Sequence, residues 1–139
     1  MKYTLKLEEQ PNPKDVAVVH QGLNAYNLPY AGEDNYKELT IFLRDETDAV
    51  IGGLLGATFW GYLRIETLWI KEDHRKQGHG ERLLNTAEKE AIKRRCRYAY
   101  LHTHSFQALS FYQNHGYKVV GELEDLPPGY SRYVLRKVL

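Results

Sequence analysis

The chain has 139 residues, of which 42% are hydrophobic and 27% are charged, so we expect one globular domain over residues 1–139. A formal net charge of +1 argues against a nucleic-acid partner, which calls for a broad basic surface. No apolar run reaches the roughly 20 residues of a membrane helix, the first residues lack a signal-peptide core, and Cys96 is a single cysteine. We therefore expect no membrane partner, no disulfide and a cytoplasmic location.

The first quarter of the chain predicts a strand, a helix and a loop. Residues 2–7 alternate between polar and apolar side chains, which is typical of a strand. Residues 13–27 follow a Pro-Asn-Pro start and carry apolar side chains at helical spacing, so we expect a helix. Residues 27–35 contain proline, glycine and aspartate and indicate a loop.

The central stretch predicts three strands and a long helix. Residues 38–44 alternate in polarity, and two further strands are expected over residues 49–59 and 62–70, joined by a turn. Residues 79–95 place their apolar side chains on one stripe, which indicates a helix with one buried face.

The last part of the chain predicts a short strand over residues 98–103, a helix and two final strands. The helix is expected over residues 106–115, with Ser105 as its N-cap and a glycine after its end. The strands are expected over residues 117–123 and 130–138 around a Pro-Pro-Gly turn. This order of elements predicts a mixed sheet with helices on its faces and one right-handed crossover.

The clearest chemical signal is the loop of residues 75–80, Arg-Lys-Gln-Gly-His-Gly, which lies between the strand 62–70 and the helix 79–95. A helix N-terminus exposes unpaired amides and a partial positive charge, and glycines let a ligand approach that backbone closely. Arg75 and Lys76 add charge at the same end. The loop is therefore suited to a pyrophosphate.

Two other phosphate motifs do not fit this loop. A P-loop requires Lys-Ser/Thr after its second glycine, where this chain has Glu81. A dinucleotide fold requires a third glycine, where Leu83 stands, and an acidic residue at the end of the next strand, which here ends His102-Thr103-His104.

Three sequence blocks stand out together at their observed separation. They are Glu66-Thr67-Leu68-Trp69-Ile70, Arg75-x-x-Gly78-x-Gly80 and Phe111-Tyr112-x-x-x-Gly116-Tyr117. Together they resemble the GNAT superfamily of N-acetyltransferases, and the resemblance extends over the whole order of elements. It implies an α/β (α+β) fold with a mixed, mostly antiparallel sheet of about six to seven strands and helices on both faces. It also implies that acetyl-CoA is the co-substrate, that no metal is needed, and that a primary amine of a small molecule or protein attacks directly in a ternary complex.

The same resemblance implies the residues that contact the coenzyme. In the family an R/Q-x-x-G-x-G/A loop holds the CoA pyrophosphate, and the backbone at 68–70 stabilises the oxyanion where the strand splays from its neighbour. The implied contacts are Leu68, Trp69, Ile70, Arg75, Lys76, Gln77, Gly78, His79, Gly80, Ser105, Ala108 and Tyr112.

Two side chains are predicted to take part in catalysis. By resemblance, Tyr112 donates a proton or a hydrogen bond to the departing thiolate, and thiol and tyrosine differ by only about one to two pKa units. The alternative for Tyr112 is a core aromatic. Glu66 alternates with Leu68 and Ile70, so we expect all three on one face and Glu66 as a base or base relay. Its alternative is a salt bridge with Arg64.

The acceptor side is less specified by the sequence. Many family members carry asparagine where this chain has Ser105, so the contact of that residue with the pantetheine arm is open. Tyr26, Tyr30 and Tyr130 lie where related enzymes build the acceptor pocket, and aromatic and acidic groups there would suit a cationic amine.

Three other readings compete with the enzyme. A catalytically inactive CoA-binding regulatory module would have the same fold, and a nucleic-acid-binding domain would show salt-sensitive affinity. His102 and His104 share a strand face as metal ligands can, but no zinc spacing accompanies them, and we expect no metal. A homodimer is implied by the family resemblance alone.

Overall fold

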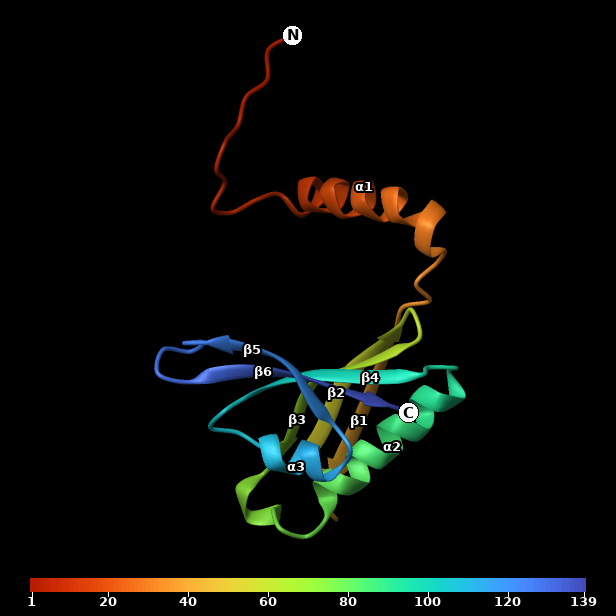
Figure 1. The fold of residues 1–139 in the computed structure, drawn as a ribbon, viewed down its shortest axis with the longest axis vertical. Helices are drawn as coiled ribbons and strands as arrows, with labels where there is room; N and C mark the ends of the chain where they lie inside the picture. The colour runs from red at the N-terminus through yellow and green to blue at the C-terminus, as the bar shows by residue number, and fades with distance from the viewer. The chain divides into compact units, whose positions relative to one another are not determined.

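The computed structural model describes residues 1–139, which divide into two compact units, residues 1–34 and residues 35–139 (Figure 1). None of the helices combines the length and the apolar character that crossing a bilayer requires.

The first unit holds the helix α1 (Pro13–Ala31) and no strand. The strand predicted over residues 2–7 is therefore wrong, because a strand forms only as part of a ladder and this unit offers no second strand.

Asn12 caps α1 by accepting a hydrogen bond from the Lys14 amide at 2.9 Å. The helix also continues through Pro29, so the first half of the predicted loop 27–35 is wrong. A proline in the last turn removes only one helical bond, and Gly32 then ends the helix at a φ of +67°.

The second unit contains all the strands. Except for α3, its strands and helices begin and end within two residues of the predicted bounds. The elements are β1 (Lys37–Arg44), β2 (Val50–Phe59), β3 (Tyr62–Ile70), the 3₁₀ turn η1 (Glu72–His74), α2 (His79–Lys93), β4 (Tyr98–His104), α3 (Leu109–Asn114), β5 (Lys118–Glu124) and β6 (Ser131–Val138).

The strands form one six-stranded sheet in the order β1-β2-β3-β4-β6-β5. Every neighbouring pair is antiparallel except β3 and β4, which are parallel and are joined through α2. This confirms the predicted crossover and the mixed, mostly antiparallel sheet.

The core lies between the sheet and the helices α2 and α3, which lie on the same side of it (Figure 1). The predicted apolar stripe of α2 is confirmed, because Leu84, Ala87 and Ala91 are fully buried. The α2 helix ends two residues earlier than predicted, since Arg95 adopts a φ of +68°. The strand residues that complete this core are Leu39, Leu54, Leu63, Ile65, Ala99, Leu101 and Leu135.

Candidate active site

The β3 strand carries a bulge at Glu66. Leu55 pairs with Thr67 and the next residue, Gly56, pairs with Ile65, so Glu66 is left without a partner on β2. A side chain at Gly56 would meet the Arg64 carbonyl oxygen at 2.3 Å, which explains the glycine opposite the bulge. A bulge bends its strand and increases the local twist.

The bulge changes which residues of β3 face the core. Ile65 is buried, and Leu68 and Ile70 pack against the core, so the core-facing positions change from odd to even numbers. Glu66 is exposed and forms an ion pair with Arg64 on the opposite face. The expectation that Glu66 shares a face with Leu68 and Ile70 is therefore wrong, because strict alternation does not continue across a bulge.

Beyond the bulge, β3 and β4 part. Their parallel ladder runs from the pair Tyr62–Tyr98 to the pair Ile65–Leu101 and stops there. A cavity of about 1040 Å³ lies at this point, with walls from β3, the loop 75–80, β4 and α3. Leu68, Trp69 and Ile70 therefore line the same cavity as the loop 75–80.

The loop 75–80 turns sharply into α2. Lys76 and Gly78 both have positive φ, at +60° and +81°. The first helical hydrogen bond runs from the Arg82 amide to the Gly78 carbonyl at 3.1 Å, and no side chain caps this end. The amides that precede Arg82 are thus available to a ligand. Arg75 ties the loop to β3 by donating from Nε to the Ile70 carbonyl at 2.8 Å.

Two further features of the loop fit an anionic ligand. His79 has a buried Nδ1 with no hydrogen-bond partner, and this residue lines the cavity, so a bound group can satisfy it. Arg75 and Lys76 also line the cavity and supply positive charge beside the helix N-terminus.

Gly80 has a different role from Gly78. An added Cβ at Gly80 would lie 3.4 Å from the Phe111 ring, so this glycine lets α2 and α3 approach closely.

Tyr112 lies on α3, where it is buried and lines the cavity. Its ring makes edge contacts with Phe111 at 5.2 Å and with Tyr117 at 5.8 Å between centroids. Desolvation by this burial raises the pKa of Tyr112 to about 12. The hydroxyl therefore stays protonated well above neutral pH and is available as a hydrogen-bond donor.

The turn between β4 and α3 is organised by Gln107, whose Oε1 accepts hydrogen bonds from the His104 amide at 2.9 Å and from Thr103 Oγ1 at 3.4 Å. The α3 helix consequently begins at Leu109, with Ala108 as its N-cap. The predicted start at residue 106 is therefore wrong.

Ser105 is used differently from the prediction. Its Oγ accepts a hydrogen bond from the Ser131 amide at 3.1 Å, and its own amide donates to the Ser131 carbonyl at 2.9 Å. The side chain thus joins β4 to β6 and does not cap α3, and the predicted N-cap is wrong. Ser105 lines a second hollow of about 320 Å³ and not the large cavity.

This second hollow, which we call the acidic hollow, is lined by three carboxylates and by Tyr130 and Tyr133. It adjoins the large cavity through Phe106, which lines the cavity and packs edge-on against Tyr130 at 4.9 Å between ring centroids. The carboxylates are those of Glu122, Glu124 and Asp125.

The sequence profile of the acetyltransferase (GNAT) family matches residues 5–117. The chain belongs to this GNAT family of acetyltransferases. It is 39% identical over 119 residues to an acetyltransferase of Agrobacterium fabrum, covering 86% of this chain and 87% of the relative. It is 36% identical over 95 residues to the blasticidin-S acetyltransferase of Streptomyces morookaense, covering 68% and 70%. A crystal structure assigned as an acetyltransferase from Agrobacterium tumefaciens superposes with a TM-score of 0.90 at 34% identity, covering 99% of this chain and 100% of that one.

Most of the residues predicted for this GNAT acetyltransferase come together in one place. The large cavity collects Glu66, Tyr112, Ala108, the strand end 68–70 and all but one of the residues of the loop 75–80. Gln77 is the loop residue that does not line it. Tyr130 and Ser105 lie in the acidic hollow. Tyr26 and Tyr30 belong to α1 in the first unit, where their rings are 5.7 Å apart.

Several cavity residues were missed by the sequence analysis as parts of this site. His102, Thr103, Phe106, Gln107 and Phe111 all line the cavity. Gln107 had a signal, since it stands three residues after His104, at the spacing at which a side chain can close a turn. The only signal for His102 was its position two residues before the end of β4. That position indicates a site residue only when β3 is known to diverge from β4 after Ile65.

Proposed function

We propose that this chain transfers an acetyl group from acetyl-CoA to a primary amine of a small molecule or protein, by direct attack in a ternary complex. The observation that supports this proposal is one cavity that is lined by the α2 N-terminus, the diverging end of β3 and Tyr112. Acetyl-CoA, when bound, supplies an activated thioester whose sulfur can depart as a thiolate.

The loop residues support the diphosphate end of this assignment. One cavity is lined by the residues at the uncapped start of α2, by Arg75 and Lys76, and by His79, whose Nδ1 has no hydrogen-bond partner. At the other end, the backbone of residues 68–70 lies beside the gap between β3 and β4, where an amide can stabilise an oxyanion.

Tyr112 would serve as a hydrogen-bond donor to the departing sulfur. Its pKa of about 12 lies well above an ordinary thiol pKa of about 8.5, so complete proton transfer is uphill by about 5 kcal/mol. The expectation of a gap of one to two units does not hold for the buried residue. A donated hydrogen bond to the developing thiolate requires no such transfer and still lowers the barrier.

The acceptor proposed is a cationic amine. The acidic hollow adjoins the cavity at the contact of Phe106 with Tyr130, and its carboxylates attract positive charge. One relative is named a blasticidin-S acetyltransferase, which supports small molecules as the first acceptors to test. Glu66 lines the cavity and remains a candidate to draw the amine or its proton.

The test is release of free thiol from acetyl-CoA in the presence of a panel of amines, alongside thermal stabilisation by CoA. Lys76→Ala should weaken acetyl-CoA binding by about 2- to 5-fold, with a smaller salt dependence, because an exposed cation contributes about 0.3 to 1 kcal/mol. Lys93→Ala, which removes the same charge at the opposite end of α2, is the matched control.

Stabilisation by CoA without thiol release for any amine would instead support a catalytically inactive CoA-binding module. If neither stabilisation nor release occurs, the proposed function is wrong.

A further inference from the structure

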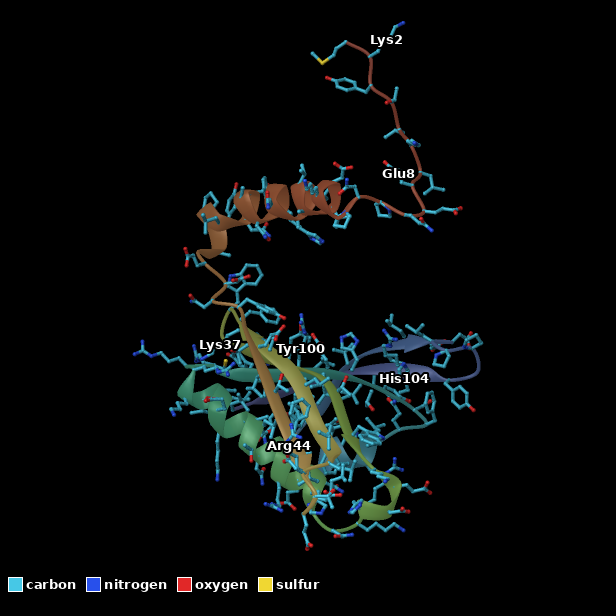
Figure 2. The ribbon with its side chains drawn as sticks, turned by 180° about the vertical axis from the view of Figure 1, so that it is seen from behind. Lys2, Glu8, Lys37, Arg44, Tyr100 and His104 are labelled. Atoms are coloured by element: carbon cyan, nitrogen blue, oxygen red, sulfur yellow. The ribbon has the colours of Figure 1, made fainter.

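His102 stands at the opening between β3 and β4. The last paired residues of the parallel ladder are Ile65 and Leu101, and the residues that follow them are Glu66 and His102. Both of these line the large cavity. Tyr100 and His104, labelled in Figure 2, precede and follow His102 on β4.

His102 faces the side of the sheet opposite to Tyr112. Leu101 and Thr103 are buried on the core side, whereas His102 between them is exposed. Tyr112 belongs to the core cluster, yet both residues line one cavity. The cavity therefore reaches both faces of the sheet at the gap between the strands, with the buried Tyr112 on one side and the exposed His102 on the other.

Two other histidines near the site have their nitrogens engaged. His104 Nδ1 lies 3.0 Å from Gln107 Oε1, and its Nε2 accepts from Arg132 Nε at 3.2 Å. Because an amide oxygen only accepts and a guanidinium only donates, His104 is held as the neutral Nδ1–H tautomer. His115 donates from Nδ1 to the Phe111 carbonyl at 2.8 Å. By contrast, no protein group forms a hydrogen bond with the imidazole of His102.

The charged and titratable groups around His102 come from three strands. Arg64 and Glu66 on β3 are paired with each other. Tyr100 on β4 lies 6.4 Å from the His102 ring between centroids. On β6, Val134 is the direct partner of His102, and two arginines flank it, Arg132 bound to His104 and Arg136 bound to the Tyr62 hydroxyl.

Glu66 is the less suitable proton acceptor of the two residues at the opening. Its carboxylate is engaged in an ion pair with the guanidinium of Arg64, whereas the imidazole of His102 has no such partner. Imidazole, with an ordinary pKa of about 6.5, is better matched to removing a proton near neutral pH.

We propose that His102 is the general base that deprotonates the acceptor amine, an assignment that rests on the proposed acetyltransferase function. Neutral His102 takes one proton from the protonated amine. The nitrogen then bonds to the thioester carbonyl carbon, and the C–S bond breaks with its electron pair on sulfur. The second nitrogen proton passes to the sulfur, giving free thiol, and His102 returns its proton to water on the exposed face.

The test compares pH profiles of kcat/KM for the acceptor amine in the wild type and in His102→Gln. Glutamine keeps a polar side chain but cannot take up a proton, so we expect about a 100-fold loss at pH 7 and loss of the acidic limb of the profile. Added imidazole should partly rescue His102→Ala. Thermal stabilisation by acetyl-CoA should be unchanged, which shows that the fold and the coenzyme site persist.

A second readout is independent of turnover. In an NMR titration of the wild type, the protonation midpoint of the His102 imidazole should coincide with the acidic limb of its kcat/KM profile. Tyr100→Phe is the matched control, because this residue shares the strand and face of His102 but does not line the cavity. It should retain the wild-type rate and acidic limb.

Three results would overturn the assignment. If His102→Gln keeps the rate and the acidic limb while the wild type transfers acetyl groups, His102 is not the base. If Glu66→Gln alone removes the limb, the carboxylate is the base. If the wild type releases no thiol with any amine, the proposed function fails, and the role of His102 fails with it.

Discussion

The Tyr117 hydroxyl donates a 2.8 Å hydrogen bond to Glu88 Oε2 in the interior of the second unit. Glu88 also receives a 2.8 Å bond from Lys137 Nζ at its other oxygen, and the lysine lies over the Tyr117 ring. Glu88 belongs to α2, Lys137 to β6, and Tyr117 directly precedes β5. This network thus joins α2 to β6 and to Tyr117, and the ring of Tyr117 in turn contacts the ring of Tyr112.

Glu88→Ala should destabilise the second unit by about 2–4 kcal/mol, because it leaves a buried hydroxyl and a mostly buried ammonium without their acceptor. Glu88→Gln should cost less, since its amide oxygen can still accept one of the two hydrogen bonds. Urea unfolding followed by fluorescence measures both. An ordinary surface substitution changes the free energy of unfolding by up to about 0.5 kcal/mol. A loss smaller than this for the alanine variant would show that the network contributes little.

The fold should lose stability in alkaline solution. Burial raises the pKa of Tyr112 to about 12 and raises that of Tyr117 further, where the Glu88 charge adds to the effect. Since the folded pKa is raised, the contribution is complete below the unfolded tyrosine pKa of about 10 and is lost as pH rises toward the folded value. For Tyr112 the complete loss is about 2.7 kcal/mol, and most of it falls between pH 10 and pH 12.

Comparison of unfolding free energies from pH 8 to pH 11 checks this. Lysines titrate in the same range, so the informative quantity is the difference between wild type and Tyr112→Phe, which should show a shallower decline. Parallel curves for the two proteins would contradict the shifted pKa.

Local signals predicted the position of the loop 75–80 and the strand β3 well. The loop depends on glycines and cations within six residues, and its chemistry follows from the helix that begins at His79. The strand 62–70 was predicted with its observed bounds, because its alternation and its turn are both local. The side chains that pack on it did not need to be known.

Features that depend on a distant partner were not predictable in this way. Residues 2–7 alternate as a strand does, but alternation cannot supply a neighbour. The bulge at Glu66 is set by Gly56 on another strand, and it reverses the face of every residue after it. For that reason the alternation of β3 placed Glu66 on the face of Leu68, and His102 was considered only as a metal ligand or as a structural or substrate-facing histidine.

Tyr112→Phe should lower kcat by about 10- to 100-fold, because the departing thiolate loses its hydrogen-bond donor. Acetyl-CoA affinity should stay within about 3-fold, since the ring still fills the same space. Thiol release and calorimetric binding measure the two quantities. Tyr117→Phe is a matched control that removes a buried hydroxyl outside the cavity, and it should reduce stability while leaving kcat near wild type. Equal kcat for wild type and Tyr112→Phe would remove the proposed role.

Gly56→Ala tests whether the bulge forms the site. An added Cβ would lie 2.3 Å from the Arg64 carbonyl oxygen, a backbone atom, so β2 and β3 must move apart or change register. We expect kcat/KM to fall by about 10-fold or more with a loss of about 1–3 kcal/mol in stability, a typical cost of overpacking.

Gly121→Ala on β5 is the matched control, because an added Cβ there meets only Val134 at 3.9 Å, an ordinary contact. It should preserve both kcat/KM and stability within about 0.5 kcal/mol. Should Gly56→Ala lose stability yet keep full kcat/KM, the divergence of β3 from β4 would not depend on the bulge. Another feature would then have to explain the gap between β3 and β4, where His102 and Tyr112 line the same cavity.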